Sequence, residues 1–246
     1  MIRIPGIVVI AIAAGVCWYL ANANNTTIIR DESHRHYMTH YEAPFEKTWE
    51  RMREEARRVI HESKSKVVTV PLLTTHECAL IVFEAERHTK DRGWTTKRHM
   101  GYPTTDVPLS DLPMGNTLVL HRVHRRIIPK IEAVFEFDGE FVDVNDLFLI
   151  RYTAGRQDSL SCHKDGSLFS FIVPLNDAFE GGGTQLPCEG GDVMKPDVGH
   201  AIVFCGQQMH RGLPVTRGTR YVLAGFLREM IKDDTCKLSA TTLKDA

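Results

Sequence analysis

Short β-rich runs separated by glycine turns make up the second half of the chain. Val, Ile, Leu and Phe are concentrated in residues 147–152, 168–175, 200–205 and 220–226, with no helical stretch between them. Gly181–Gly183 and Gly190–Gly191 mark two of the turns. Strands at this spacing are typical of an antiparallel sandwich or barrel. This half therefore predicts a mainly β fold.

The half before residue 147 has helical character. From Pro44 onward, apolar residues recur at three- and four-residue steps, while Glu and Arg fill the opposite face. The recurring residues are Phe45, Trp49, Met52, Ala56, Val59 and Ile60. This pattern predicts an amphipathic helix packed on a core. We expect a second helix over 115–137, strands over 67–73 and 79–84, and a long surface loop over 94–112. The helices should buttress one face of the β core.

The N-terminus carries a stretch without charge. Between Arg3 and Arg30 no residue is charged, and the apolar part, Ile4–Ala21, is 18 residues long. That is about the minimum length for a membrane-spanning helix. The positive-inside rule then places the N-terminus in the cytosol and the rest across the membrane. Two other readings stay open: a signal peptide cleaved near Ala23, and a buried helix of the fold.

This stretch sets the expected domain organisation. Residues 1–23 form a signal anchor or signal peptide, 24–42 a polar stalk, and 43–246 one domain with its core at about 146–228. Three His at 34, 36 and 40 could bind metal, but a solvated stalk is favoured because no acidic or Cys partner stands nearby. Two overlapping glycosylation patterns begin at Asn24 and Asn25. We expect an endoplasmic reticulum or Golgi membrane protein with a lumenal domain, or a secreted protein if the segment is cleaved.

Charge and cysteine content limit the partners. The chain has 30 Lys and Arg against 31 Asp and Glu, a net charge of −1, which argues against a broad nucleic-acid-binding surface. Of six Cys, one lies in the N-terminal segment. The five lumenal ones are Cys78, Cys162, Cys188, Cys205 and Cys236. An odd number requires at least one free thiol or an intermolecular bridge. The oligomeric state is not indicated.

Three residues in the β-rich half have the chemistry of a metal site. His163 and Asp165 are two apart, and residues i and i+2 of a strand face the same way. His210, after the run 200–205, is the natural third ligand. Two His and one carboxylate on one face of an octahedron form the non-haem Fe(II) arrangement, which leaves open positions for other ligands.

A lone Arg enters the apolar strand 220–226. A buried guanidinium needs an anionic partner. Arg220 could form a structural salt bridge, or it could bind the carboxylate of a small molecule. Beside His163, Asp165 and His210, the second reading is favoured.

These motifs resemble a known family. In order, they are Asp146–Tyr152, Leu160–Ser167, Phe171–Asn176, Phe179–Thr184, Gly199–Phe204, His210–Thr216 and Arg220-Tyr221. Their order and gaps resemble the catalytic core of the Fe(II)- and 2-oxoglutarate-dependent oxygenases of the prolyl 4-hydroxylase and lysyl hydroxylase type. The segment His99–Asp106 is similar to the region before that core.

The resemblance implies a fold and a set of roles. The fold would be a double-stranded β-helix, or jelly roll. His163, Asp165 and His210 would bind Fe(II), Arg220 would bind 2-oxoglutarate, and Tyr152 would donate its hydroxyl to the same co-substrate. O₂ would be consumed, and L-ascorbate would restore Fe(II). No side chain is assigned as a catalytic acid or base.

The resemblance also implies a substrate class. We expect hydroxylation of a peptidyl residue of a protein in the secretory pathway, prolyl first, with a lysyl hydroxylase as the alternative. Collagen-type prolyl 4-hydroxylases have Lys at the clamp position, so Arg220 resembles instead the lysyl hydroxylase and oxygen-sensing prolyl hydroxylase branches.

Three other functions compete with this one. The same three ligands could serve a zinc hydrolase, although that chemistry has no use for Arg220. A nucleic-acid demethylase is disfavoured by the acidic lumenal chain. A catalytically degenerate, membrane-tethered binding module would be expected to have lost a ligand or the clamp, and all are present here.

Overall fold

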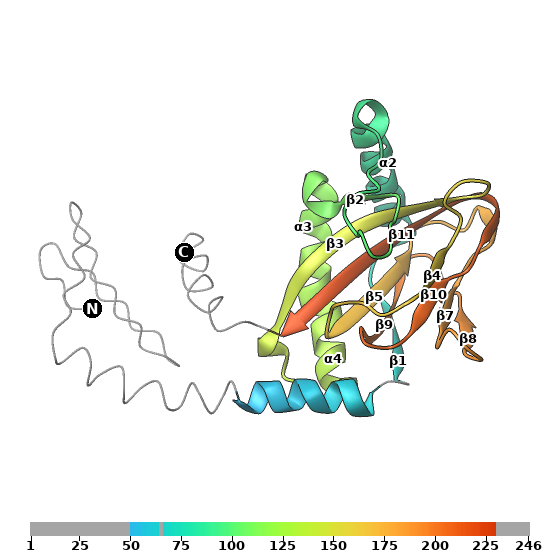
Figure 1. Ribbon diagram of the computed structural model, residues 1–246. Helices are drawn as coiled ribbons and strands as arrows, with labels where there is room; N and C mark the ends of the chain where they lie inside the picture. The colour runs from blue at the N-terminus through green and yellow to red at the C-terminus, as the bar shows by residue number, and fades with distance from the viewer. Residues whose placement is uncertain (1–49, 64–65, 230–246) are drawn as a thin grey trace, which may run out of the picture. The chain divides into compact units, whose positions relative to one another are not determined.

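Two antiparallel sheets form the centre of the protein. The computed structural model describes residues 50–63 and 66–229 (Figure 1). The seven-stranded sheet runs β1 (Val67–Pro71), β9 (His200–Cys205), β5 (Phe169–Pro174), β11 (Val215–Glu229), β3 (Val142–Thr153) and β2 (Asp106–Pro108), with β6 (Phe179–Gly181) beside β11. The four-stranded sheet runs β4 (Leu160–His163), β10 (His210–Gly212), β7 (Thr184–Leu186) and β8 (Asp192–Met194). The predicted mainly β fold is confirmed.

Alternation along the strands separates the two faces of the large sheet. In β3, Leu147 and Leu149 belong to the main hydrophobic core, whereas Phe148, Ile150 and Tyr152 belong to a second cluster on the opposite face. This period of two is what the pleat of a strand dictates. One face therefore builds the core, and the other is free to line a cavity.

Helices from the first half cover the core face. They are residues 50–62, α2 (Thr75–Arg92), α3 (Pro113–Arg122) and α4 (Ile128–Phe135). A π-helical stretch, η2 (Val123–Ile127), joins α3 to α4, so the helix expected over 115–137 is present with one irregular turn. In Figure 1, α3 and α4 pass behind β3 and β11. Phe135 packs its ring against Phe169 of β5 at 5.1 Å between centroids.

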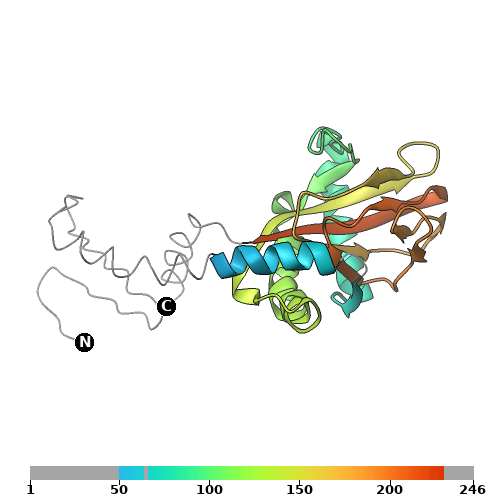
Figure 2. The same cartoon turned by 60° about the horizontal axis from the view of Figure 1, so that its bottom comes forward.

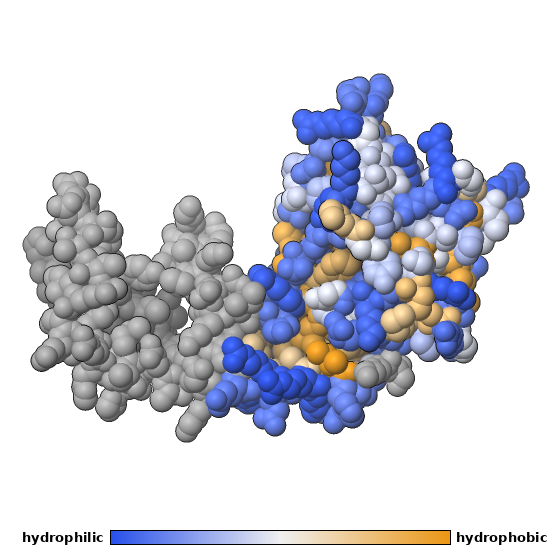
Figure 3. All heavy atoms as spheres, in the orientation of Figure 1, coloured by the Kyte–Doolittle hydropathy of each residue, from blue (hydrophilic) through white to orange (hydrophobic). Residues whose placement is uncertain are grey.

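The first helix is amphipathic, as its sequence predicts. Met52, Ala56 and Val59 are buried, and the outward side is hydrophilic (Figure 3). Arg58 donates hydrogen bonds to the carbonyls of Phe135 and Glu136, so this helix lies beside the end of α4 (Figure 2). The part of the pattern before residue 50 lies outside the described residues.

The strand expected over 79–84 is wrong, because these residues lie in α2. Thr74 caps that helix in a reciprocal pair with Glu77, which satisfies backbone donors at its start. The buried residues Cys78, Ile81 and Ala85 follow the three- and four-residue spacing of a helix face. A short apolar run fits a strand or a buried helix equally well, so its length alone misled the prediction.

The surface loop expected over 94–112 is wrong in its second part. Asp106–Pro108 forms β2 and pairs with Phe148–Ile150 of β3. A 3-10 turn, η1 (Leu109–Asp111), follows, and Leu109 and Leu112 are fully buried. The segment therefore contributes to the core and to the edge of the large sheet.

The predicted membrane segment lies outside the described residues, as do the stalk and Cys236. Within residues 50–63 and 66–229, no helix has both the length and the apolar character to span a bilayer.

Candidate metal centre

A cavity of about 210 Å³ opens on the face of the large sheet that the helices leave free. Strands β3, β5 and β11 supply mostly apolar side chains to its wall, and β4 and β10 supply polar ones. The polar residues Tyr152, His163, Asp165, His210 and Arg220 all line it. Convergence of a few polar groups in an apolar cavity is typical of a small-molecule site.

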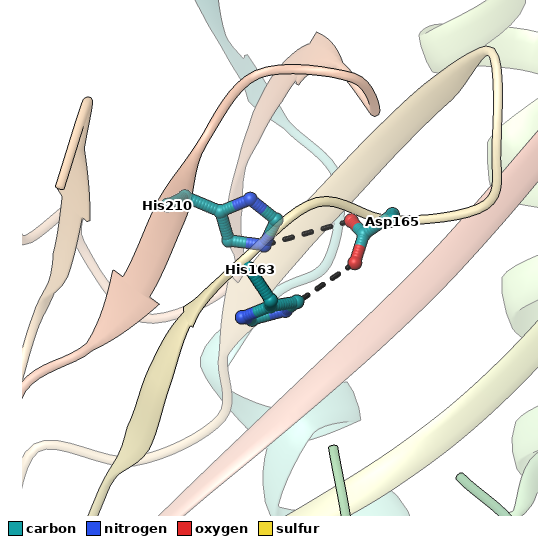
Figure 4. Close-up of side chains that lie close together, drawn as sticks. All are labelled: His163, Asp165 and His210. Carbon is teal, nitrogen blue, oxygen red and sulfur yellow. Dashed lines mark ion pairs between the residues drawn. The ribbon is translucent and has the colours of Figure 1, made fainter. Parts of the chain in front are cut away.

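His163, Asp165 and His210 lie together at one end of this cavity (Figure 4). His163 ends β4 and His210 begins β10, and the two are directly paired across the small sheet. One potential ligand atom from each of the three residues lies within 4.8 Å of the others. All three side chains are buried. Sequence spacing predicted this cluster, and the structure brings its members together.

Hydrogen bonds orient both imidazoles. The Nδ1 atom of His163 is 2.8 Å from the carbonyl of Ser161, and that of His210 is 2.9 Å from the carbonyl of Gln208. The Nε2 atoms therefore face Asp165, at 3.4 Å and 3.5 Å from its carboxylate oxygens (Figure 4). A second partner that fixes the tautomer and the ring is typical of histidines that bind metal.

Asp165 is held from several sides. Its amide donates to the carbonyl of Gly206 at 2.9 Å, and the hydroxyl of Ser170 donates to Oδ2. The side chain of Gln207 donates to its carbonyl at 3.0 Å. The carboxylate is thereby fixed in place before any ion binds.

The pKa values of the two imidazoles shift in opposite directions. Burial disfavours the charge of His163, but hydrogen bonding and attraction to Asp165 outweigh it and raise the pKa. Burial lowers the pKa of His210, because the attraction of Asp165 is too weak to compensate. Two imidazoles and a carboxylate, all converging on one point, fit a divalent transition metal.

Arg220 is buried and has no carboxylate within ion-pair distance in the described part of the chain. It donates to the carbonyl of Gly183 at 3.2 Å and to Thr184 Oγ1 at 3.4 Å. Burial lowers its pKa. The salt-bridge reading of Arg220 therefore has no acidic residue to support it. What remains is a buried cation at a cavity wall that is positioned for an anion.

The geometry of the turn beside Arg220 explains why it consists of three glycines. Gly181, Gly182 and Gly183 have φ values of +80°, +60° and +114°. A Cβ on Gly182 would also lie 3.2 Å from Cδ of Arg220. Glycine is required here for its backbone conformation and for the close approach of the guanidinium.

Tyr152 lies directly opposite Arg220 in the β3–β11 register. The guanidinium carbon is 5.8 Å from the centre of its ring. Burial raises the pKa of Tyr152 to about 12, so the phenol remains protonated near neutral pH and can donate a hydrogen bond into the cavity.

The segment after Trp94 forms a wall of the cavity that the sequence alone did not predict. His99 packs on Phe148 at 4.5 Å, and Tyr102 lies 4.9 Å from His163, between ring centroids. A buried carboxylate, Asp106, holds this wall through Arg98 and His99. The signal available in the sequence was the resemblance of His99–Asp106 to a pre-core region.

A disulfide joins Cys162 and Cys188. Cys162 precedes His163 in β4, and Cys188 follows β7, so the bond ties together the two sides of the small sheet. Cys162 does not line the cavity. Cys78 is buried in α2, and burial raises its pKa to about 12.

Known proteins were compared with this chain, and no family model matches it. The multifunctional procollagen lysine hydroxylase and glycosyltransferase of Caenorhabditis elegans is 29% identical over 185 residues, 70% of this chain and 25% of that protein. The LH3 protein of Rattus norvegicus is 31% identical over 171 residues, 64% of this chain and 22% of that protein. The chain is similar in sequence to one part of these procollagen lysine hydroxylases. It spans about a quarter of their length.

Solved structures agree on the fold of this hydroxylase relative. A viral collagen prolyl hydroxylase from Paramecium bursaria Chlorella virus-1 matches with a TM-score of 0.51 and 17% identity, covering 69% of this chain and 99% of that one. A Pseudomonas putida prolyl-4-hydroxylase matches with a TM-score of 0.52 and 16% identity, covering 72% and 100%. The predicted jelly-roll fold and the predicted resemblance to 2-oxoglutarate oxygenases are confirmed.

Proposed function

We propose that this protein is an Fe(II)- and 2-oxoglutarate-dependent dioxygenase that hydroxylates a peptidyl residue. One observation carries the proposal: a buried His163, Asp165 and His210 cluster shares a cavity with Arg220, a buried cation that has no carboxylate partner among the described residues. The named sequence relatives are procollagen lysine hydroxylases, which agrees with this chemistry.

Each residue has a defined role in this proposal. His163, Asp165 and His210 would hold Fe(II), Arg220 would bind the distal carboxylate of 2-oxoglutarate, and Tyr152 would donate its hydroxyl to the same molecule. Fe(II), together with 2-oxoglutarate and O₂, supplies the oxidising power needed to hydroxylate an unactivated C–H bond. L-Ascorbate is expected as the reductant that restores Fe(II).

The protein contributes position and a water-poor environment. The apolar face formed by Phe148, Ile150, Val222 and Ala224 keeps bulk water from the reacting centre. The two His rings and the carboxylate are oriented by their own hydrogen bonds before the ion binds, so little reorganisation is needed. No side-chain acid or base is required.

The secretory pathway is the proposed location. The Cys162–Cys188 disulfide is consistent with an oxidising compartment, where such bonds persist. A type II membrane anchor at residues 1–23, with the domain in the lumen of the endoplasmic reticulum or Golgi, fits the charge distribution of the N-terminal sequence. The partner there would be a protein or peptide substrate.

The test is conversion of 2-oxoglutarate to succinate by the purified protein with Fe(II), ascorbate and a peptide library, with hydroxylation read by mass spectrometry. His163→Ala should abolish succinate formation and weaken metal binding, since one of three ligands is lost. His124→Ala is the matched control, because His124 is exposed on η2. Full activity of His163→Ala would refute the iron site. Hydrolysis supported by zinc without O₂ would favour the zinc hydrolase instead.

A further inference from the structure

We propose that the cavity selects an uncharged substrate side chain, with proline the natural candidate, and that Lys164 helps to reject the ammonium group of lysine. The inference rests on the proposed function and names the substrate class of the same site. It departs from the lysine hydroxylases that are its sequence relatives.

The cavity offers no anion to a lysine ammonium. Within the described part of the chain, Asp165 is the only carboxylate among its lining residues, and the proposed metal occupies that group. Asp106 is fully buried and does not line the cavity, and Arg98 and Thr104 already bind it. A buried ammonium without a partner carries a large desolvation cost.

Cations, in contrast, are present around the cavity. Lys164 is exposed and contributes to the lining between the two proposed ligands His163 and Asp165. Arg220 is at the wall, and its charge would be used by the co-substrate. An incoming ammonium would therefore meet like charge, which disfavours the wrong partner as effectively as contacts favour the right one.

The Phe148 part of the aromatic wall already has a cation on its ring. Aromatic faces can attract an ammonium, but the guanidinium of Arg98 already lies 5.4 Å from the centre of the Phe148 ring. The other rings at the cavity, Tyr102, His99 and Phe226, make a surface of the kind that binds proline-containing peptides. Tyr102 is 42% exposed, so a peptide lying over the metal cluster can reach it.

The experiment uses the wild-type protein loaded with Fe(II) and 2-oxoglutarate. Three peptide libraries with randomised flanks carry Pro, norleucine or Lys at one central position. Norleucine keeps the length of the lysine stem but lacks the ammonium, so the comparison isolates charge. We expect hydroxylation, and retention of peptides on immobilised protein, to be at least about tenfold lower for Lys than for Pro, a factor equal to 1.4 kcal/mol, with norleucine retained better than Lys.

A variant tests the role of Lys164. Lys164→Gln should reduce the discrimination between norleucine and Lys peptides at least about threefold. This ratio is independent of any general loss of activity. Lys90→Gln is the control, because Lys90 is an exposed lysine at the end of α2, and it should leave the ratio unchanged.

The outcomes separate the two proposals. Preferred hydroxylation of Lys would overturn this inference and leave the proposed function intact. An unchanged ratio in Lys164→Gln would remove Lys164 from the explanation of any selectivity. Absence of succinate with all three libraries would overturn the proposed function, and this inference with it.

Discussion

At the scale of single residues, Arg220 lowers the stability of the fold, although the proposed function needs it. It is buried in β11, and the groups near its guanidinium are a carbonyl, a hydroxyl and an aromatic ring rather than a carboxylate. A buried charge with only neutral partners destabilises the folded state. Such a residue is explained by an anion that arrives after folding.

Replacing Arg220 should therefore improve stability while removing co-substrate binding. We expect Arg220→Met to raise the dissociation constant of 2-oxoglutarate at least about 30-fold, because a charge-assisted bond is lost. Metal affinity should remain near the wild-type value. The free energy of unfolding of the protein without 2-oxoglutarate should rise by about 1 kcal/mol. Titration calorimetry with Mn(II)-loaded protein and urea denaturation measure these quantities.

Arg217→Met is the matched control for that prediction. Arg217 lies on the same strand but is exposed and paired with Glu180, so its loss should leave 2-oxoglutarate binding unchanged. Loss of stability in Arg220→Met, with full retention of 2-oxoglutarate binding, would mean that Arg220 is a structural residue.

The sequence indicated that His163, Asp165 and His210 would lie together, as they do in the structure, but it misjudged their local geometry. The i, i+2 argument assumed that His163 and Asp165 share a strand, yet β4 ends at His163. Asp165 is instead directed by Gly206, which is distant in sequence, and by Ser170 of the following strand, β5. For the same reason the sequence could not show that Arg220 has no carboxylate partner among the described residues, since a carboxylate could have come from any strand.

At the scale of elements, β4 is a short strand that positions a proposed metal ligand. It has four residues, pairs with β10, and ends in a proposed metal ligand. The Cys162–Cys188 disulfide gives this strand a covalent link to the segment after β7. The position of His163 thus depends on a bond next to it in the chain.

Removing this disulfide should cost stability and metal affinity together. The bond closes a loop with a sequence separation of 26, for which chain entropy predicts about 3.5 kcal/mol. We expect the Cys162→Ser, Cys188→Ser double variant to lose about this much free energy of unfolding and to bind Mn(II) more weakly. Urea denaturation and calorimetry measure both.

Reduction provides the control for the disulfide. Dithiothreitol should lower the stability of the wild-type protein and leave that of the double variant unchanged. Equal stability and metal affinity in the two proteins would show that β4 is held by its hydrogen bonds alone.

Elements with a clear local signal were predicted better than a strand fixed by long-range pairing, and helix α2 is the exception. The four apolar runs of the second half were read correctly as strands, because such runs and the glycine turns between them are local signals. Helix α2 was misread although the capping pair Thr74 and Glu77 was visible in the sequence. Strand β2 is fixed by pairing with β3 and by the burial of Asp106 against Arg98, and neither leaves a local pattern.

At the scale of the whole molecule, the first half of the chain covers the core face of the large sheet, and the second half supplies most of the cavity lining. Helices of the first half pack on one face of the large sheet through residues such as Ile81, Ile127 and Phe135. That coverage leaves the opposite face, with the small sheet beside it, for the cavity. A large core on one side can therefore support a polar, partly unsatisfied site on the other.

The topology of the full chain gives the last prediction. An uncharged Ile4–Ala21 segment preceded by Arg3 should insert with its N-terminus in the cytosol. The catalytic domain would then reach the oxidising lumen, where Cys162 and Cys188 can pair. In intact microsomes we expect a C-terminal tag to resist protease, the protein to resist carbonate extraction, and an endoglycosidase to remove a glycan from Asn24 or Asn25. An Asn24→Gln, Asn25→Gln variant is the control for the glycan. A shortened, carbonate-soluble lumenal protein would identify a cleaved signal peptide instead, and a protease-sensitive tag with reduced Cys162 would refute the lumenal location.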